Sequence, residues 1–211
     1  MIEIESILDC TKYLEGIKGI IFDLDDTLYS EKEYVKSGYK AVSNLFSDSI
    51  LCEKILWEAF CNGENAIDIL LDKKDITSDV LKNQCLDVYR NHAPDIHLYE
   101  GVKEMLKSLK EQGLKIGMIT DGRPNGQHLK ITSLGIESYF DKIIVTDEFG
   151  GIEFRKPNPK SYKLMKEFME IEFSELCYIG DNVKKDFKSP QILGMKCIWF
   201  KNKNGLYYDT V

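Results

Sequence analysis

Short apolar runs separated by segments of helical periodicity are the feature that most limits how this chain can fold. The runs are IKGIIF at 17–22, LKIGMI at 114–119, KIIV at 142–145, LCYI at 176–179 and KCIWF at 196–200. Such runs are typical of parallel strands buried on both faces of a sheet. Helices are expected at 101–112, 125–134, 159–169 and 183–193, with a leading helix at 3–15. This alternation predicts an α/β fold with a doubly wound parallel sheet.

The interval between the first apolar run and residue 101 departs from this alternation. It contains no convincing strand, and apolar residues such as Tyr34, Val35 and Val42 recur at helical spacing. Helices are expected there at 31–46, 51–61, 66–71 and 78–91. The sequence therefore predicts a helical insertion at 30–97 within an α/β core made of 1–29 and 98–211.

Charge and composition exclude several classes of protein. The 211 residues carry a formal net charge of −7 and contain no dense run of Lys or Arg. A nucleic-acid partner is not expected, because proteins that bind nucleic acids usually carry a basic surface. No apolar stretch approaches the about 18 residues of a membrane span, and the acidic start MIEIESILDC is unlike a signal peptide.

The six cysteines are scattered, and none belongs to a C-x-x-C pair. A zinc site is therefore not expected. Scattered cysteines with apolar neighbours are typical of buried side chains in a reducing compartment, so a cytoplasmic location is expected. The sequence leaves the oligomeric state open.

Carboxylates are concentrated where the first apolar run ends. Asp23, Asp25 and Asp26 fall within four residues and are followed by Thr27. In open α/β sheets the ligand crevice lies beyond the carboxyl ends of the strands. Mutually repelling carboxylates there favour a hard divalent cation with oxygen ligands. The alternative is a polar loop with an Asx turn and a helix cap.

Two later runs also end in polar residues. Thr120 and Asp121 precede a glycine and a helix, and the hydroxyl and free N–H groups there suit an anion or an ordinary cap. Gly180 is followed by Asp181, which is expected to cap the next helix, and by Asp186, expected about one turn inside it. A second pair of acids favours a metal site over a coincidental cap.

A lysine on a proline-rich turn completes the set. Lys156 precedes Pro157-Asn158-Pro159, and proline fixes the direction of the residue before it. A cation on a rigid turn suits a phosphate, although a surface lysine is the alternative. A metal, an anion pocket and a nucleophile are what phosphoryl transfer requires.

Taken together, the motifs resemble those of the haloacid dehalogenase-like (HAD) superfamily. They match in order over residues 17–200: FDLDDTL at 22–28, ITDG at 119–122, RKP at 155–157, and Gly180-Asp181 with Asp186. The resemblance implies a Rossmann-like core. The helical insertion looks like the superfamily's C1-type cap, which would place the chain in subfamily I and close over the pocket.

The resemblance also implies a mechanism. Asp23 would be the nucleophile that forms an aspartyl-phosphate, and Asp25 would protonate the leaving alcohol and later activate water. Asp23, the backbone carbonyl of Asp25 and Asp181 would hold Mg²⁺, with Asp186 acting through water or through Lys156.

The remaining motif residues receive supporting roles from the same resemblance. Thr120, the N–H of Asp121 and Lys156 would bind phosphate, and Lys156 would also neutralise charge on Asp23. Thr27 would order the loop, and Asp26 is interpreted as structural.

The residue two positions after the nucleophile separates two reaction types. Dehalogenases of the superfamily carry a non-acidic residue there, whereas this chain has Asp25. An acid suits an ester that needs a proton on its leaving group. We therefore predict a magnesium-dependent phosphatase. The alternatives are a phosphomutase or phosphotransferase of the same superfamily, a receiver-like signalling module and a non-catalytic phosphate-binding module.

The substrate is expected to be a small phosphorylated metabolite. Tyr29 lies nearest the loop and is a possible substrate contact, and Glu31, Tyr34, Lys36 and Tyr39 follow it. Packing at the hinge and within the helical bundle is the alternative for these side chains.

Overall fold

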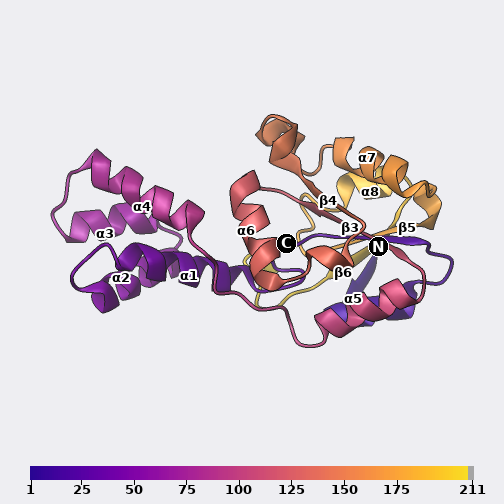
Figure 1. Cartoon of the computed structure of the whole chain (residues 1–211), viewed down its shortest axis with the longest axis horizontal. Helices are drawn as coiled ribbons and strands as arrows, with labels where there is room; N and C mark the ends of the chain where they lie inside the picture. The colour runs from indigo at the N-terminus through magenta and orange to yellow at the C-terminus, as the bar shows by residue number, and fades with distance from the viewer. Residues whose placement is uncertain (209–211) are drawn as a thin grey trace. The chain divides into compact units, whose positions relative to one another are not determined.

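The computed structural model describes residues 1–208 and divides into two compact units (Figure 1). One unit comprises Met1–Glu31 together with the chain from His97 onward, and the other comprises Lys32–Ile96. The boundaries expected from the sequence, after residues 29 and 97, lie close to these positions. All six cysteines are free. Among the described helices, none combines the length and apolar character needed to cross a membrane.

The first unit is built on a six-stranded sheet in the order β1-β6-β5-β2-β3-β4. Its strands are β1 (Ile2–Ile4), β2 (Gly19–Phe22), β3 (Lys115–Thr120), β4 (Lys142–Val145), β5 (Leu176–Gly180) and β6 (Lys196–Phe200). Every pairing between these strands is parallel. The prediction of a parallel, doubly wound α/β fold is confirmed, and each expected apolar run forms a strand.

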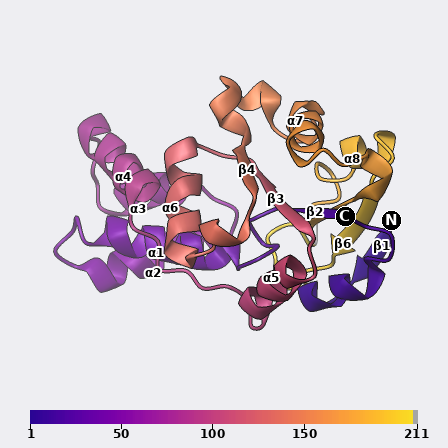
Figure 2. The same cartoon turned by 45° about the vertical axis from the view of Figure 1, so that its right-hand side comes forward.

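Helices cover both faces of this sheet (Figure 2). They are α5 (Val102–Glu111), α6 (Pro124–Leu134), α7 (Lys160–Met169) and α8 (Lys188–Ile192). The 3₁₀ turns are η1 (Ile7–Tyr13), η2 (Glu137–Tyr139), η3 (Thr146–Phe149), η4 (Ile152–Phe154) and η5 (Phe173–Glu175). α5 and η1 lie on one face of the sheet, and α7 and α8 lie on the other. α7 packs close to β3 because Gly117 has no side chain: a Cβ there would lie 2.6 Å from the Met165 sulfur.

The expected leading helix at 3–15 is wrong. Ile2–Ile4 pairs in parallel with β6 as an edge strand, and only Ile7–Tyr13 is helical, as a 3₁₀ turn. The alternating pattern of Ile2, Glu3 and Ile4 fits a strand, because successive side chains point to opposite faces.

The helix expected at 183–193 is also wrong in length, since α8 begins only at Lys188. In the segment just before α8, side chains accept hydrogen bonds from backbone N–H groups. Asn182 N–H donates to Asp186 Oδ2 at 3.0 Å, and Lys184 N–H donates to Asn182 Oδ1 at 3.1 Å. Such local bonds compete with helix formation. Asp186 therefore lies in a loop before α8, and Phe187, rather than Asp181, is the N-cap of that helix.

The second unit is helical, as the sequence predicts. It contains α1 (Glu31–Ser43, whose first residue belongs to the core unit), α2 (Ser49–Cys61), α3 (Ala66–Lys73) and α4 (Asp79–Asn91). The helices share their own core, which includes Val42, Leu56 and Leu70. Tyr39 belongs to this core, Tyr34 stacks edge-on against Tyr89, and the Lys36 ammonium lies over the Trp57 ring. These contacts lie within the helical unit and favour the packing interpretation of these side chains.

Candidate active site

The sheet order places the ends of three strands beside one another. β2 pairs with β5 on one side and with β3 on the other, and Phe22 is in register with both Ile179 and Met118. Asp23, the residue after β2, therefore lies next to Asp181, the residue after β5. The Asp23 N–H donates to Ile179 O at 2.9 Å. A pocket of about 290 Å³ opens at this edge and is lined by Asp23, Asp25, Glu31, Asp121, Arg155, Lys156, Asp181, Lys185 and Tyr207.

The loop after Asp23 is fixed by Asp26. This residue is fully buried and adopts the left-handed conformation with φ 52°. Its carboxylate accepts the N–H groups of Glu31 at 2.9 Å and Leu206 at 2.7 Å, and its carbonyl accepts the Asn202 amide at 2.8 Å. These contacts give Asp26 the structural position inferred from the sequence. The Thr27 hydroxyl is buried and makes no hydrogen bond within the described residues, and the ordering role expected of Thr27 stays a prediction.

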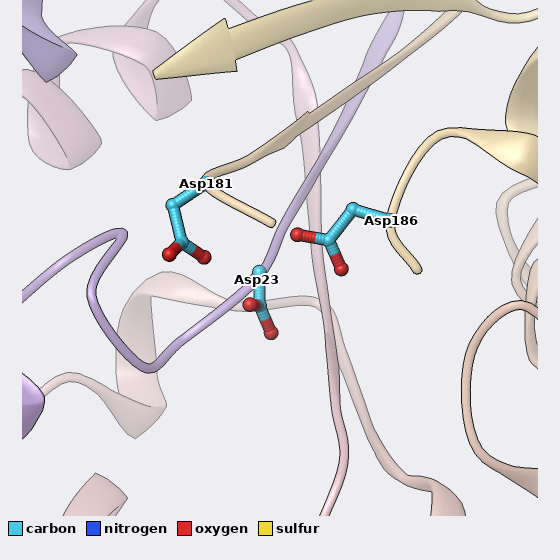
Figure 3. Close-up of side chains that lie close together, drawn as sticks. All are labelled: Asp23, Asp181 and Asp186. Carbon is cyan, nitrogen blue, oxygen red and sulfur yellow. The ribbon is translucent and has the colours of Figure 1, made fainter. Parts of the chain in front are cut away.

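Three carboxylates converge at this edge of the sheet (Figure 3). One oxygen each of Asp23, Asp181 and Asp186 lies within 4.8 Å of the others. Burial, followed by the charges of Asp186 and Asp23, raises the pKa of Asp181 to about 9. Burial likewise raises the pKa of Asp23 to about 6, although Lys156 opposes this shift. A cation would relieve this repulsion, and a donor set made only of carboxylate oxygens fits a hard divalent ion.

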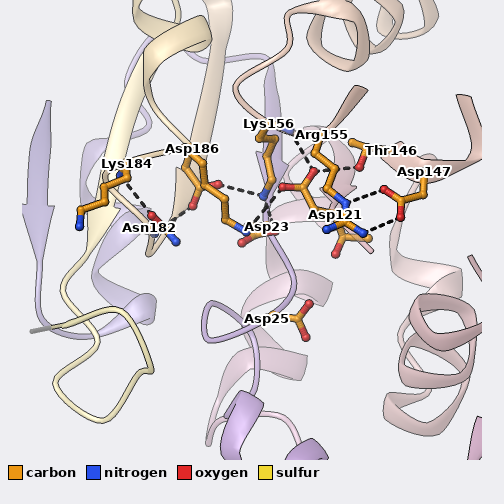
Figure 4. A network of polar contacts seen from close by, with 12 residues as sticks. Asp23, Asp25, Asp121, Thr146, Asp147, Arg155, Lys156, Asn182, Lys184 and Asp186 are labelled. Carbon is orange, nitrogen blue, oxygen red and sulfur yellow. Dashed lines mark hydrogen bonds and ion pairs between the residues drawn. The ribbon is translucent and has the colours of Figure 1, made fainter. Parts of the chain in front are cut away.

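Lys156 places its ammonium group among these carboxylates (Figure 4). Its Nζ lies 2.6 Å from Asp23 Oδ1, 2.9 Å from Asp186 Oδ1 and 3.1 Å from the Tyr178 hydroxyl. The Lys156 side chain is fully buried, so its interpretation as a surface lysine is wrong. Burial alone would lower the pKa of Lys156, but the charges of Asp186 and Asp23 outweigh this and raise it well above its ordinary value.

The side chain of Asp121 anchors the loop that carries Lys156. Asp121 Oδ1 accepts the Thr146 hydroxyl at 2.8 Å and the Lys156 N–H at 3.0 Å, and Lys185 Nζ lies 3.5 Å from Asp121 Oδ2. Thr120, at the end of β3, is fully buried and accepts a short hydrogen bond from the Gln127 amide. Both residues therefore lie at the strand end where the sequence placed an anion pocket.

Asp25 is held from several sides. Lys130 Nζ lies 2.7 Å from Asp25 Oδ1, the Gln127 amide donates to Oδ2 at 3.0 Å, and the Tyr29 hydroxyl makes a short bond to Oδ1. Burial alone would raise the pKa of Asp25, but Lys130, with Tyr29 and Gln127, lowers it below its ordinary value. Tyr29 is completely buried and its hydroxyl bonds Asp25, which favours the packing interpretation of this side chain.

The sequence interpretation missed several residues of the site. Lys130 and Gln127 were not singled out, although their spacing of three places them on one face of α6. Arg155 and Lys185 line the pocket. The Arg155 guanidinium donates two hydrogen bonds to the Asp147 carboxylate, at 2.7 and 2.6 Å. Arg155 directly precedes Lys156, and Lys185 directly precedes Asp186, so their places beside predicted site residues were the available sequence signal. No sequence signal indicated Tyr207, because it reaches the pocket from the C-terminal segment, far in sequence from the motifs.

This strand-end site on a parallel α/β core defines a hydrolase of the HAD type. The family model described as haloacid dehalogenase-like hydrolase matches residues 20–200, and the chain belongs to this family. The resemblance inferred from the motifs is thereby confirmed.

The chain is similar to proteins named glyceraldehyde 3-phosphate phosphatase. A glyceraldehyde 3-phosphate phosphatase of Methanocaldococcus jannaschii is 34% identical over 92% of this chain and 88% of its own length. A protein of the same name from Pyrococcus abyssi is 28% identical over 88% of this chain and 82% of its length.

Solved structures share the fold. A putative HAD-hydrolase from Bacillus subtilis bound to magnesium matches with TM-score 0.64 and 20% identity, over 88% of this chain and 87% of that one. A putative β-phosphoglucomutase from Thermotoga maritima matches with TM-score 0.66 and 18% identity, over 87% and 85%.

Proposed function

We propose that this hydrolase is a magnesium-dependent phosphatase that cleaves a small phosphate monoester through an aspartyl-phosphate on Asp23. The observation that carries the proposal is the buried contact of Asp23 with Lys156 at 2.6 Å, beside Asp181 and Asp186. An ammonium beside the carboxylate offsets the charge that an incoming phosphate would meet. The relatives named as phosphatases support the same class of reaction.

The reaction divides into two steps. In the first, an oxygen of Asp23 attacks phosphorus, the bond to the ester oxygen breaks, and Asp25 gives its proton to the departing alkoxide. In the second, Asp25 takes a proton from water, whose oxygen attacks the same phosphorus and frees Asp23 and inorganic phosphate. The lowered pKa of Asp25 favours its ionised form at rest. A phosphate dianion in the pocket opposes that charge and favours the proton that the first step needs.

The phosphate ligands are assigned by proximity to Asp23. We assign phosphate binding to the Thr120 hydroxyl, the backbone N–H of Asp121 and the Lys156 ammonium. Thr120 and Asp121 lie at the end of β3, which pairs with the strand that carries Asp23. Lys156 is the cation in direct contact with Asp23.

We assign Mg²⁺ to Asp23, Asp181 and the backbone carbonyl of Asp25. The ion pair of Asp186 with Lys156 at 2.9 Å supports a role for Asp186 through that lysine. When bound, the ion supplies positive charge to the phosphoryl oxygens.

The substrate in this proposal is a small phosphorylated metabolite, for which the pocket of about 290 Å³ beside Asp23 has room. Glyceraldehyde 3-phosphate is the first candidate, since it is the substrate in the names of these relatives. No nucleic acid or membrane partner belongs to the proposal. A cytoplasmic location is part of it and is supported by the free state of the cysteines.

The test is release of inorganic phosphate from a panel of small phosphate esters, with Mg²⁺ and with EDTA. The proposal expects release that requires the metal and falls to background in Asp23→Asn, a change that removes the nucleophile but little volume. An Asp23→Asn variant that keeps more than a few per cent of the activity would overturn the role of Asp23.

The same assay separates the alternatives. A phosphomutase or phosphotransferase would move the phosphate to a second acceptor without steady release. A receiver-like or non-catalytic module would release none from any ester.

A further inference from the structure

Two polar side chains on α6 are buried in a way that the fold alone does not require. Gln127 and Lys130 are 3% and 5% exposed, although amide and ammonium groups normally remain in water. Burying such groups is unfavourable unless each finds a partner. Their spacing of three directs both toward the same side of the helix.

That shared side faces the catalytic loop. Lys130 Nζ contacts Asp25 Oδ1 at 2.7 Å, and Gln127 Nε2 donates to Asp25 Oδ2 at 3.0 Å. Each oxygen of the carboxylate therefore has its own donor on α6, which fixes the plane and the direction of the group. Tyr29 adds a third donor from the loop itself.

Gln127 also connects two parts of the site. The same Nε2 atom that donates to Asp25 makes a short bond to the Thr120 hydroxyl oxygen. The carboxylate after β2 and the hydroxyl at the end of β3 are thus held in one network. A displaced Gln127 would change both positions together.

Stability is a weak explanation for the Lys130–Asp25 pair. The desolvation of two buried charges offsets most of their attraction, and apolar side chains of similar volume often stabilise a protein equally well. A methionine would fill the volume of Lys130 without the need for a partner. The pair is better explained by what it does to Asp25.

We propose that Lys130 and Gln127 are positioning residues for the reaction, which hold the Asp25 carboxyl in the orientation needed for proton transfer. The inference rests on the proposed phosphatase function, because it assigns Asp25 the proton-transfer role. Neither residue touches the phosphate in this account: Lys130 acts through Asp25, and Gln127 acts through both Asp25 and Thr120.

The test is a double-mutant cycle of Lys130→Met and Asp25→Asn, with phosphate release from the best ester of the panel as the readout. In the wild-type background, Lys130→Met is expected to lower kcat about 100-fold, the lower end of what a positioned acid/base contributes, with KM changed less than threefold. In the Asp25→Asn background the same change is expected to have less than a threefold effect, because the group that it positions is gone. Gln127→Leu is expected to lower kcat less than Lys130→Met does and also to raise KM, because it releases the Thr120 hydroxyl as well as Asp25.

Lys107→Met is the matched control, since Lys107 is exposed on α5 and pairs with the exposed Glu111 at 3.8 Å. Equal losses from Lys130→Met in both backgrounds, or a loss confined to KM, would overturn the inference. If Lys130→Met does not fold, as judged by urea unfolding, the cycle with Gln127→Leu decides on kcat alone: an equal loss of kcat in both backgrounds would overturn the inference. Failure of the wild-type protein to release phosphate would instead remove the proposed function.

Discussion

At the scale of single residues, the site concentrates negative charge that its own lysine only partly offsets. Asp23, Asp181 and Asp186 approach within 4.8 Å, and Lys156 pairs with Asp23 and Asp186. Within residues 1–208, Asp181 has no comparable cation: Lys185 opposes the rise of its pKa less than burial and the carboxylates of Asp186, Asp23 and Asp26 promote it. The metal-free protein should therefore be destabilised by Asp181 when that residue is ionised.

This repulsion predicts a pH dependence with a definite sign. The pKa of Asp181 rises from its ordinary 3.8 to about 9 in the folded protein. Between these values the folded state keeps a proton that the unfolded state has lost, so the stability of the metal-free protein falls as pH rises. Asp181→Asn should remove this part of the slope and, at pH 8 in EDTA, stabilise the protein by at least about 1.4 kcal/mol, the equivalent of one pKa unit.

Urea unfolding at pH 5 and pH 8 measures this effect, with Asp87→Asn, a change at an exposed site, as the control. Added Mg²⁺ should stabilise the wild-type protein by binding the folded state and should stabilise Asp181→Asn much less. A slope that persists unchanged in the variant would contradict the prediction.

At the scale of elements, the segment after β6 is attached to the catalytic loop. The Asn202 amide donates to Asp26 O and to the Tyr99 hydroxyl, each at 2.8 Å, and Leu206 N–H donates to the Asp26 carboxylate. The segment then brings Tyr207 to the pocket. A loop with a left-handed aspartate is thus fixed by residues from the far end of the chain.

Removal of this attachment should be costly. Asn202→Ala leaves the Asp26 carbonyl without its buried amide donor, and we expect a loss of about 1–3 kcal/mol in the free energy of unfolding. Asn204→Ala is the control, because that side chain is exposed on the same segment. Equal unfolding midpoints for both variants would show that the segment does not stabilise the loop.

The elements also show what the sequence could predict. The longer strands were predictable because each is a short run of mostly apolar residues buried on both faces of the sheet. β1 was missed because Ile2–Ile4 is short and pairs only with β6 at the edge of the sheet. The predicted length of α8 was wrong, because the side chains of Asn182 and Asp186 bind backbone N–H groups in the segment that was expected to be helical from its periodicity.

At the scale of the whole molecule, the site joins residues that are far apart in the chain. Parallel strands end at one edge of the sheet, so Asp23, Lys156 and Asp181 could be expected to meet from their places in the sequence. Lys130 and Gln127 could not, because a lysine and a glutamine on a helix normally indicate a solvated face. Both side chains are buried because they contact Asp25, and this contact arises only from the tertiary structure. The role of the helical unit as a cap stays a prediction.

The most direct test of the central claim is to look for a phosphoryl group on Asp23. The enzyme would be mixed with its best ester and Mg²⁺, quenched in acid within a single turnover, digested and analysed by mass spectrometry. The account predicts one phosphorylated peptide, which contains Asp23 and is absent from Asp23→Asn. A phosphoryl group on a different residue, or full turnover with no covalent species at any quench time, would contradict it.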